Sequence, residues 1–332
     1  MRIFKYLFDR AYKIKKLLED HFLGDLNLSK KVIILIDLAF SIIIYGCGIT
    51  DFFQYQFYKR KHRERKDFIV HRKRMWLVKH LNDKNDRKIF DQKPVFNKLF
   101  NDYLGREWLD ITTSSFDDFY KFTNKFNKFL VKPVSGSHGI GIRILEADKT
   151  NNLESLFKTL RAEQALAEEL IIQNDQMAEF NPSSVNTVRV VTVIDNNLKT
   201  NIMTANLRMG CGDNYADNFH HDGIAALLDV NTGRVITHGI DKKLQSYIYH
   251  PTSGKKITGF QVPFWPSIID TVKQASQVVP TVRYVGWDII IGKRNNIMLV
   301  EGNAAADPDI SQMPDQVGKW PLFRNVLTPG KR

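Results

Sequence analysis

The feature that most constrains the fold is a pair of strand-like segments near the C-terminus, residues 285–291 and 297–302, joined by the polar run Lys-Arg-Asn-Asn. Loops of about four residues close antiparallel hairpins. We expect Gly292 to pair with Ile297 across this loop, which fixes the register of both strands. A chain with this hairpin must build an antiparallel sheet, and so an α+β fold is favoured over an all-helical one.

The register decides which side chains share a face, because side chains alternate along a strand. It places Ile290 opposite Leu299. It also places Asp288 opposite Glu301, with Asn303 two residues further along the same face. Two carboxylates directly opposite each other destabilise a sheet unless a cation lies between them. Carboxylate and amide oxygens suit Mg2+ that is shared with nucleotide phosphates, and so these three residues are candidate metal ligands. The alternative is a polar face open to solvent.

A second hairpin carries a glycine-rich loop. Residues 129–132 form a strand that ends at Pro133, and another strand follows over residues 142–145. The glycines let backbone N–H groups approach phosphate oxygens, and Lys132 adds a positive charge. This is not a Walker A motif, because Gly-Lys-Ser/Thr is absent, and a glycine hairpin without a ligand is the alternative. The candidate nucleotide-binding residues of the loop are Ser135, Gly136, Ser137, His138, Gly139 and Gly141.

Two arginines lie on a further pair of predicted strands. Residues 187–194 and 201–209 are expected to be antiparallel neighbours across a turn at residues 195–197. Arg189 and Arg208 are their notable polar side chains. Fixed guanidinium groups in a sheet that also carries a metal site would suit the oxygens of a transferring phosphate. Ordinary edge arginines are the alternative.

The N-terminal part of the chain is basic and partly apolar. Residues 2–20 predict a basic amphipathic helix, docked on the protein or lying in the interface of an anionic bilayer. Residues 32–49 form an apolar run interrupted by Asp37; an Asp near the centre of a span costs about 3 kcal/mol, whereas each Leu or Ile returns about 0.5 kcal/mol. We therefore expect a buried helix there. Residues 59–74 predict a solvated helix followed by a short apolar stretch.

The distribution of charge bears on the partners. The formal net charge is +12, and residues 1–80 hold 18 Lys and Arg against 8 Asp and Glu, which leaves +10 there and +2 in the rest. Proteins that bind nucleic acid carry their basic stripe on the folded binding domain. The pattern therefore argues against nucleic acid and favours an anionic membrane surface or a local partner. Two cysteines without a paired spacing and a start without a signal-peptide pattern predict a cytoplasmic protein.

A lysine at the end of a strand, a glycine-rich hairpin and a later Asp with Glu-x-Asn, in this order, resemble the ATP-grasp superfamily. The stretches LVKPVSGSHGIGI, NPSSVNTVRVVTV and GWDIIIGKRNNIMLVEGN are similar to the sugar-transfer-associated ATP-grasp family, which is found with genes for bacterial surface polysaccharides. The resemblance implies an α+β ATP-grasp fold. In it, an N-terminal helical region, residues 1–88, precedes two α+β subdomains, residues 89–182 and 183–332, that clasp ATP.

The resemblance also implies roles for individual residues. Lys98 and Lys132 would bind nucleotide phosphates beneath the glycine-rich loop, and Arg189 would contact the γ-phosphate or the acyl phosphate. The residues that would hold Mg2+ are Asp288, Glu301 and Asn303. Many ATP-grasp enzymes place a Glu at the adenine-side hinge, where this sequence offers Gln173. The ribose contact is therefore open between Gln173, Asp175 and Glu179.

By this resemblance the chain is an ADP-forming carboxylate-amine ligase that uses Mg-ATP. The expected acid is a uronic acid or related carboxylate of a surface polysaccharide precursor, such as capsule or O-antigen, and the expected nucleophile is an amino acid or other amine. The glycan substrate could be a small molecule or lipid-linked, and the enzyme could be peripheral at the inner face of the membrane. The alternatives are other ATP-grasp phosphoryl or thiol-ligase chemistry, and a noncatalytic membrane-peripheral adaptor.

Overall fold

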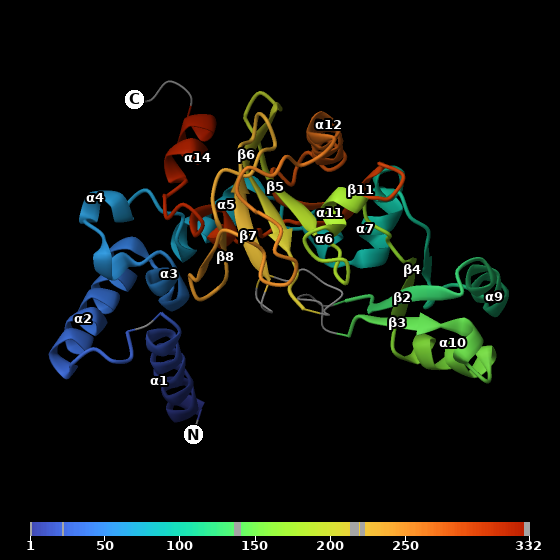
Figure 1. The fold of residues 1–332 in the computed structure, drawn as a ribbon, viewed down its shortest axis with the longest axis horizontal. Coiled ribbons are helices and arrows are strands. Elements are labelled where there is room, and N and C mark those ends of the chain that lie inside the picture. Colours follow the sequence, from blue (N-terminus) through green and yellow to red (C-terminus); the bar gives the residue numbers. More distant parts are fainter. Residues whose placement is uncertain (1, 22, 136–140, 213–218, 220–222, 329–332) are drawn as a thin grey trace.

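The computed structural model of the chain describes residues 2–21, 23–135, 141–212, 219 and 223–328. Within these ranges it combines helices with two antiparallel sheets (Figure 1), which confirms the predicted α+β class. The subdomain boundaries given above stay predictions.

Helices come first along the chain. Each is short except the first two and α5, and a 3-10 turn, η1, separates α3 from α4. The elements before the first strand are α1 (Arg2–Asp20), α2 (Leu28–Tyr45), α3 (Ile49–Gln54), η1 (Phe57–Lys59), α4 (His62–Arg65), α5 (His71–Leu81), α6 (Lys88–Asp91), α7 (Lys93–Leu99) and α8 (Asn101–Leu104). The predicted helix over residues 2–20 is confirmed. The solvated helix expected within residues 59–74 is only the four-residue α4, because Phe68, Ile69 and Val70 are buried directly after it.

A four-stranded sheet follows, in the order β1-β4-β2-β3. Its strands are β1 (Trp108–Asp110), β2 (Lys128–Pro133), β3 (Arg143–Glu146) and β4 (Ala165–Glu169). The helices α9 (Phe116–Lys125) and α10 (Leu153–Ala162), with the 3-10 turn η2 (Ala147–Lys149), accompany it. Phe119, Phe129 and Phe157 form the centre of its core. The predicted glycine hairpin is therefore the β2–β3 pair, which lies at the edge of this smaller sheet.

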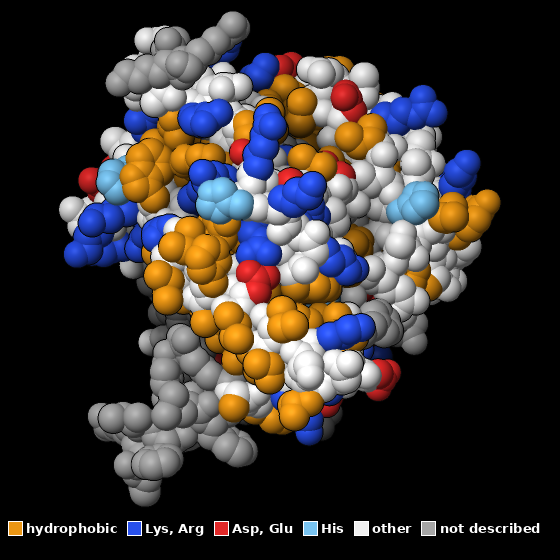
Figure 2. All heavy atoms as spheres, turned by 90° about the vertical axis from the view of Figure 1, so that its left-hand side faces the viewer, with side chains coloured by type: hydrophobic (Ala, Val, Ile, Leu, Met, Phe, Trp, Pro, Cys, Tyr) orange, Lys and Arg blue, Asp and Glu red, His pale blue; other side chains and the backbone are white. Residues whose placement is uncertain are grey.

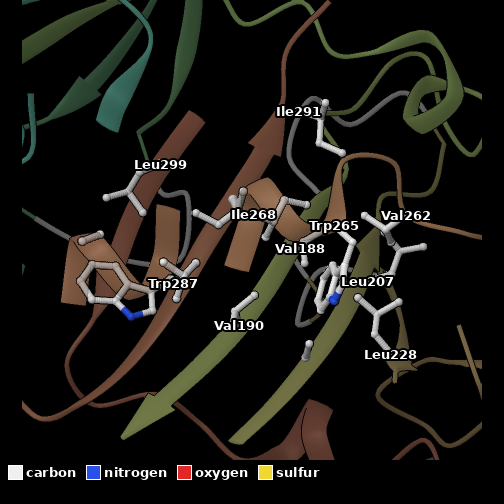
Figure 3. Close-up of a cluster of buried hydrophobic side chains, with 14 of the residues drawn as sticks. Val188, Val190, Leu207, Leu228, Val262, Trp265, Ile268, Trp287, Ile291 and Leu299 are labelled. Atoms are coloured by element: carbon white, nitrogen blue, oxygen red, sulfur yellow. The ribbon is translucent and has the colours of Figure 1, made fainter. Parts of the chain in front are cut away.

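A seven-stranded sheet forms the larger part of the chain, in the order β11-β10-β5-β6-β7-β8-β9. Its strands are β5 (Thr187–Ile194), β6 (Thr200–Met209), β7 (Ile224–Leu228), β8 (Gly239–Ile240), β9 (Ser246–Tyr247), β10 (Tyr284–Ile291) and β11 (Ile297–Asn303). One face packs on α12 (Trp265–Ser276), whose Trp265 and Ile268 meet Val188 of β5 (Figure 3). The segment before β5 contains α11 (Asp175–Ala178).

The opposite face of the large sheet is covered along part of its length. Helix α5 contacts β10, α13 (Asp309–Gln312) contacts β6 and β7, and α14 (Trp320–Leu327) contacts β6. Val191, Val193 and Tyr284 are buried beneath them. At the end of this face that the helices leave free, the strands carry polar side chains instead of apolar ones.

The register of the β10–β11 hairpin differs from the expectation near its turn. The pairs are Ile291 with Ile297, Ile290 with Met298 and Ile289 with Leu299. The pairings of Gly292 with Ile297 and of Ile290 with Leu299 are therefore wrong by one residue. Gly292 instead donates to the Asn296 carbonyl oxygen across a shorter turn, residues 293–295, in which Asn295 adopts a left-handed conformation. A β-bulge at Val300, which has no partner on β10, then shifts the register back by one residue. Asp288 consequently still faces Glu301, as expected.

Helix α2 is not the buried helix that the sequence predicts. Only one stripe is fully covered, formed by Ile34, Leu38, Ser41 and Tyr45, and most of its other apolar side chains are exposed. The run also ends earlier than expected, at Gly46, whose left-handed conformation caps the helix. In the part of the chain that the structure describes, no helix is both long and apolar enough to cross a membrane.

Candidate active site

Two arginines and an aspartate meet at the free end of the large sheet. Arg189 of β5 lies opposite Asp288 of β10, and its Nη2 donates to Asp288 Oδ2 at 2.7 Å while its Nε donates to Oδ1. Arg208 of β6 donates from Nη1 to the same Oδ2 at 3.0 Å. Burial alone would raise the pKa of Asp288, but Arg189 and then Arg208 outweigh it and lower that pKa to about 2. The structure thus brings together both predicted catalytic arginines and one predicted metal ligand.

Glu301 of β11 completes this group from the neighbouring strand. Its residue surface is exposed, yet its carboxyl group contacts that of Asp288 through a hydrogen bond that favours a proton on Glu301. Desolvation of the carboxylate and then repulsion from Asp288 raise the pKa of Glu301. Asn303 lies on the same face, and its Oδ1 accepts a hydrogen bond from the backbone of Ala305 at 3.0 Å.

These oxygens fit a hard divalent cation. Two carboxyl groups in contact, one of them with a raised pKa, form a site whose repulsion a cation would relieve, and an amide oxygen lies beside them. Asp288 Oδ2 already accepts from two guanidinium groups, and so an ion would share this carboxylate with them. Among the described residues no group of three or more His, Cys, Asp and Glu could hold a metal. The fit therefore depends on two carboxylates, Asn303 and ligands supplied by the nucleotide.

A second charged group comes from the small sheet. Glu168 of β4 is 2% exposed, and its Oε1 lies 2.5 Å from Lys132 Nζ of β2. Arg106, which precedes β1, donates from Nε to Glu168 Oε2 at 2.9 Å. Burial would raise the pKa of Glu168, but Arg106 and then Lys132 lower it to about 2. Lys132, a predicted phosphate ligand, is therefore held in place by a buried carboxylate.

Arg106 and Lys93 connect the two charged groups. Arg106 Nη1 donates to the carbonyl oxygen of Leu299 at 2.8 Å, and so one guanidinium spans from β4 to β11. Lys93, at the start of α7, has a pKa that is lowered by desolvation and then by Lys132, while Glu301 opposes both. The side chains of both sheets therefore lie within electrostatic range of one another.

Lys98, the other predicted phosphate ligand, is exposed on α7. Lys98 lies five positions after Lys93 on this helix, a rotation of roughly 140° at about 100° per residue. The two side chains therefore lie on different sides of α7, and Lys93 is the one within electrostatic range of Lys132 and Glu301. The phosphate contact of Lys98 stays a prediction.

The residues considered for the ribose contact lie in other settings. Gln173 is buried, and its side chain donates to the Asn181 carbonyl at 3.2 Å and accepts from the Asn186 backbone at 3.0 Å. Glu179 pairs with Lys255, and Asp175 is exposed in the first turn of α11. The Gln173 side chain thus fixes the segment that joins the two sheets, and the ribose contact stays open.

The glycine-rich loop lies only partly within the described residues. Ser135 is exposed directly after β2. Gly141 has a φ of +80°, and a Cβ there would meet Pro133 Cγ at 2.8 Å. This position therefore requires glycine. Gly136, Ser137, His138 and Gly139 lie outside the described residues.

Three residues of the site were not predicted from the sequence: Lys93, Arg106 and Glu168. A buried Glu at the end of a strand is a signal of a fixed charge pair, and Glu168 ends the apolar run of β4. Arg106 and Lys93 gave no comparable signal, because the partners of each come from segments distant in the sequence.

Comparisons show which known proteins this chain is similar to. A model of the family described as sugar-transfer-associated ATP-grasp matches residues 72–327. The ATP-grasp ligase PsnB in complex with its minimal precursor is 17% identical, with a TM-score of 0.47 over 74% of this chain and 63% of PsnB. The chain thus spans less than two thirds of the length of PsnB.

Two further solved structures are similar to parts of this chain. N5-carboxyaminoimidazole synthetase from Staphylococcus aureus with ADP is 9% identical, with a TM-score of 0.41 over 67% of this chain and 45% of that one. An ADP complex of another N5-carboxyaminoimidazole ribonucleotide synthetase is 9% identical, with a TM-score of 0.48 over 79% of this chain and 58% of that one. A comparison with curated proteins finds no match. The family match covers more than half of the chain, and so the chain belongs to the sugar-transfer-associated ATP-grasp family.

Proposed function

We propose that this chain is an ATP-dependent, ADP-forming ligase that activates a carboxylate as an acyl phosphate, which an amine then attacks. The observation that carries the proposal is the convergence of four cationic side chains on three carboxyl groups contributed by both sheets. The cations are Lys93, Lys132, Arg189 and Arg208. Fixed cations around acidic metal ligands suit the stabilisation of a transferring phosphoryl group.

The chemical need for activation follows from the substrate. A carboxylate is a poor acyl donor, because oxide would have to leave, and phosphorylation gives it a better leaving group. Mg2+, when bound with ATP by Asp288, Glu301 and Asn303, would neutralise phosphate charge and orient the γ-phosphate. Arg189 and Arg208 would hold the phosphoryl oxygens, and their pairing with Asp288 keeps both guanidinium groups oriented.

The two lysines would bind the nucleotide from the side of the small sheet. Lys132 is fixed by Glu168, and Lys93 lies within electrostatic range of both Lys132 and Glu301. A lysine ammonium acts on phosphate as a point charge and needs no particular orientation. Both groups can therefore neutralise nucleotide phosphates while the arginines remain near the reacting oxygen.

The substrate class follows from the family description alone. Its association with sugar transfer supports a uronic acid or related carboxylate of a bacterial surface polysaccharide precursor as the acid, and an amino acid or other amine as the nucleophile. Thiol-ligating or phosphorylating chemistry at the same nucleotide site is the second candidate.

The acyl phosphate can be trapped directly. Incubation of the full chain with Mg-ATP, a panel of uronic acids and hydroxylamine should yield ADP, phosphate and the hydroxamate of one acid, detected by mass spectrometry. Asp288→Asn should abolish the product, and Lys98→Ala, at an exposed position, should not. ADP release that needs no carboxylate, or formation of AMP, would contradict the proposal, and a phosphorylated product stable to hydroxylamine would favour the second candidate.

A further inference from the structure

Helix α2 exposes an unusual amount of apolar surface. Ile33 is 64% exposed, Ile36 65% and Ile43 74%. Isolated exposed hydrophobic residues are common on protein surfaces, but a contiguous set on one helix marks an interaction site. The exposed apolar side chains of α2 are Leu28, Val32, Ile33, Leu35, Ile36, Ala39, Phe40, Ile42, Ile43 and Ile44.

The helix itself is firmly built into the protein. The Asn27 side chain caps its N-terminus, and the Gly46 N–H donates to the Ile42 carbonyl at its C-terminus. Its only acidic residue, Asp37, points to the body of the protein, where Arg65 pairs with both carboxylate oxygens. The exposed face of α2 therefore carries no acidic side chain and has a fixed shape.

The exposed apolar face is too wide for an ordinary protein contact. At about 100° per residue, the exposed apolar positions span roughly 200° of the circumference of α2. A helix that packs on a protein core buries a stripe little more than about 100° wide. A convex surface that is apolar around more than half of a helix is better matched by a fluid medium that surrounds it.

Basic side chains surround this face. Lys30 is exposed at the start of α2 and Arg72 near its end, where Arg72 donates to the carbonyl oxygen of Ile44. Arg63 and Lys66 are exposed on and after α4, which contacts α2 through Arg65. Figure 2 shows hydrophobic side chains gathered over the lower part of this side of the molecule, with Lys and Arg above and around them. Cations beside an apolar face complement anionic lipid headgroups above acyl chains.

We propose that the exposed face of α2 binds the surface of an anionic lipid bilayer. The helix lies in the plane of the interface, its isoleucines and Phe40 among the upper acyl chains and the flanking Lys and Arg at the headgroups. Pairing with a second copy of this chain fits less well, because residues 1–80 carry a net charge of +10 and two such surfaces would repel each other. The inference does not depend on the ligase activity.

Flotation with lipid vesicles tests the proposal on the full chain. We expect the protein to float with vesicles of phosphatidylcholine and phosphatidylglycerol at low salt, less in high salt, and weakly with phosphatidylcholine alone. The double variant Ile36→Glu/Ile43→Glu should lower partitioning by more than about tenfold, since each isoleucine contributes about one factor of ten. The matched control is Leu198→Glu/Ile236→Glu, which adds the same charges at exposed apolar positions outside α2. Its loss of vesicle partitioning should be less than half of the loss in the α2 variant.

Three results would overturn the proposal. One is equal flotation of the α2 variant and the control variant. Another is equal binding to anionic and neutral vesicles. The third is a wild-type dimer in light scattering that the α2 variant converts to a monomer while neither form binds vesicles, which would assign the face to a second copy. Melting curves of both variants show whether each is folded. If the α2 double variant does not fold, the single variants Ile36→Glu and Ile43→Glu are tested in its place.

Discussion

At the scale of single residues, the site separates two neighbouring carboxyl groups by their surroundings. Asp288 accepts hydrogen bonds from two guanidinium groups, which hold its pKa at about 2. Glu301 lies on the next strand, where desolvation and then repulsion from Asp288 raise its pKa. One carboxylate therefore stays charged, while the other gains most from a cation.

The placement of two lysines on α7 gives the first prediction. Lys93→Ala should weaken Mg-ATP binding by roughly tenfold or more, because it removes a cation close to Lys132 and Glu301. Lys98→Ala is the matched control, since it removes the same charge from the exposed side of the same helix. Isothermal titration with a nonhydrolysable ATP analogue measures both. Weaker binding in Lys98→Ala alone would assign the phosphate contact to Lys98 instead.

Asp309 gives a prediction about pH. Burial and then repulsion from Asp307 raise its pKa from 3.8 to about 7. A carboxyl group whose folded-state pKa is raised stabilises the protein below the unfolded pKa, and this stability is lost as the pH rises through 7. Asp309→Asn should therefore raise the free energy of unfolding at pH 8 by a few kcal/mol at most, because the amide keeps the acceptor for the Ile310 N–H.

Urea denaturation at pH 4, 6 and 8 measures this effect. The difference between Asp309→Asn and wild type should grow from pH 4 to pH 8. Asp25→Asn, which removes a carboxylate at an exposed position, should show no such growth. A difference that is constant over this range would show that Asp309 does not titrate between the two states.

At the scale of elements, the bulge in β11 has a clear physical role. It breaks the regular pairing at Val300, and Arg106 then donates to the carbonyl oxygens of Leu299 and Val300 at 2.8 and 3.3 Å. In a regular strand, successive carbonyl groups point to opposite edges, and so only one of these two oxygens could face Arg106 without the bulge. The sequence predicted that Asp288 lies opposite Glu301. It did not predict the bulge, because Arg106, which binds the bulged carbonyl groups, lies 193 residues before Leu299.

The buried pair that Arg106 forms gives a stability prediction. Arg106→Met should lower the free energy of unfolding by about 3–5 kcal/mol, since it leaves Glu168 buried with one cation fewer and removes the guanidinium donor from three backbone carbonyls. The matched control is Lys125→Met, which removes an exposed pair with Glu107 and should cost at most about 1 kcal/mol. Guanidinium denaturation compares them, and similar losses in both variants would contradict the role of the buried network.

The helices were harder to predict than the strands. The strand over residues 187–194 is confirmed at both ends, since its β-branched residues are buried on both faces. For α2 the residues around most of the helix are apolar, and nothing in the sequence could show that Ile34, Leu38, Ser41 and Tyr45 would form its fully covered stripe. Periodicity identifies a buried stripe only when the other side is polar.

At the scale of the whole molecule, the site exists only because two sheets meet. Its cations come from α7, β2, β5 and β6, and its carboxyl groups from β4, β10 and β11. Spacing along the chain could place residues on one hairpin, such as Asp288 and Glu301, but not across the two sheets. The family resemblance supplied the order of these segments, whereas the position of Lys93 near Lys132 and Glu301 needed the structure.

The last prediction concerns the balance between stability and ligand binding across both sheets. Glu301→Gln should raise the melting temperature of the ligand-free protein near neutral pH by a small amount, because desolvation and then repulsion from Asp288 raise the pKa of the Glu301 carboxyl group, and solvent at this exposed residue screens both effects. The same change should reduce the further rise that Mg-ATP produces, since a ligand present at about a hundred times its Kd stabilises by about 2.7 kcal/mol and the variant binds Mg2+ more weakly. ATP with EDTA should stabilise both proteins equally. A variant less stable than wild type without ligand would show that Glu301 serves the fold, whereas an unchanged rise with Mg-ATP would exclude it as a metal ligand.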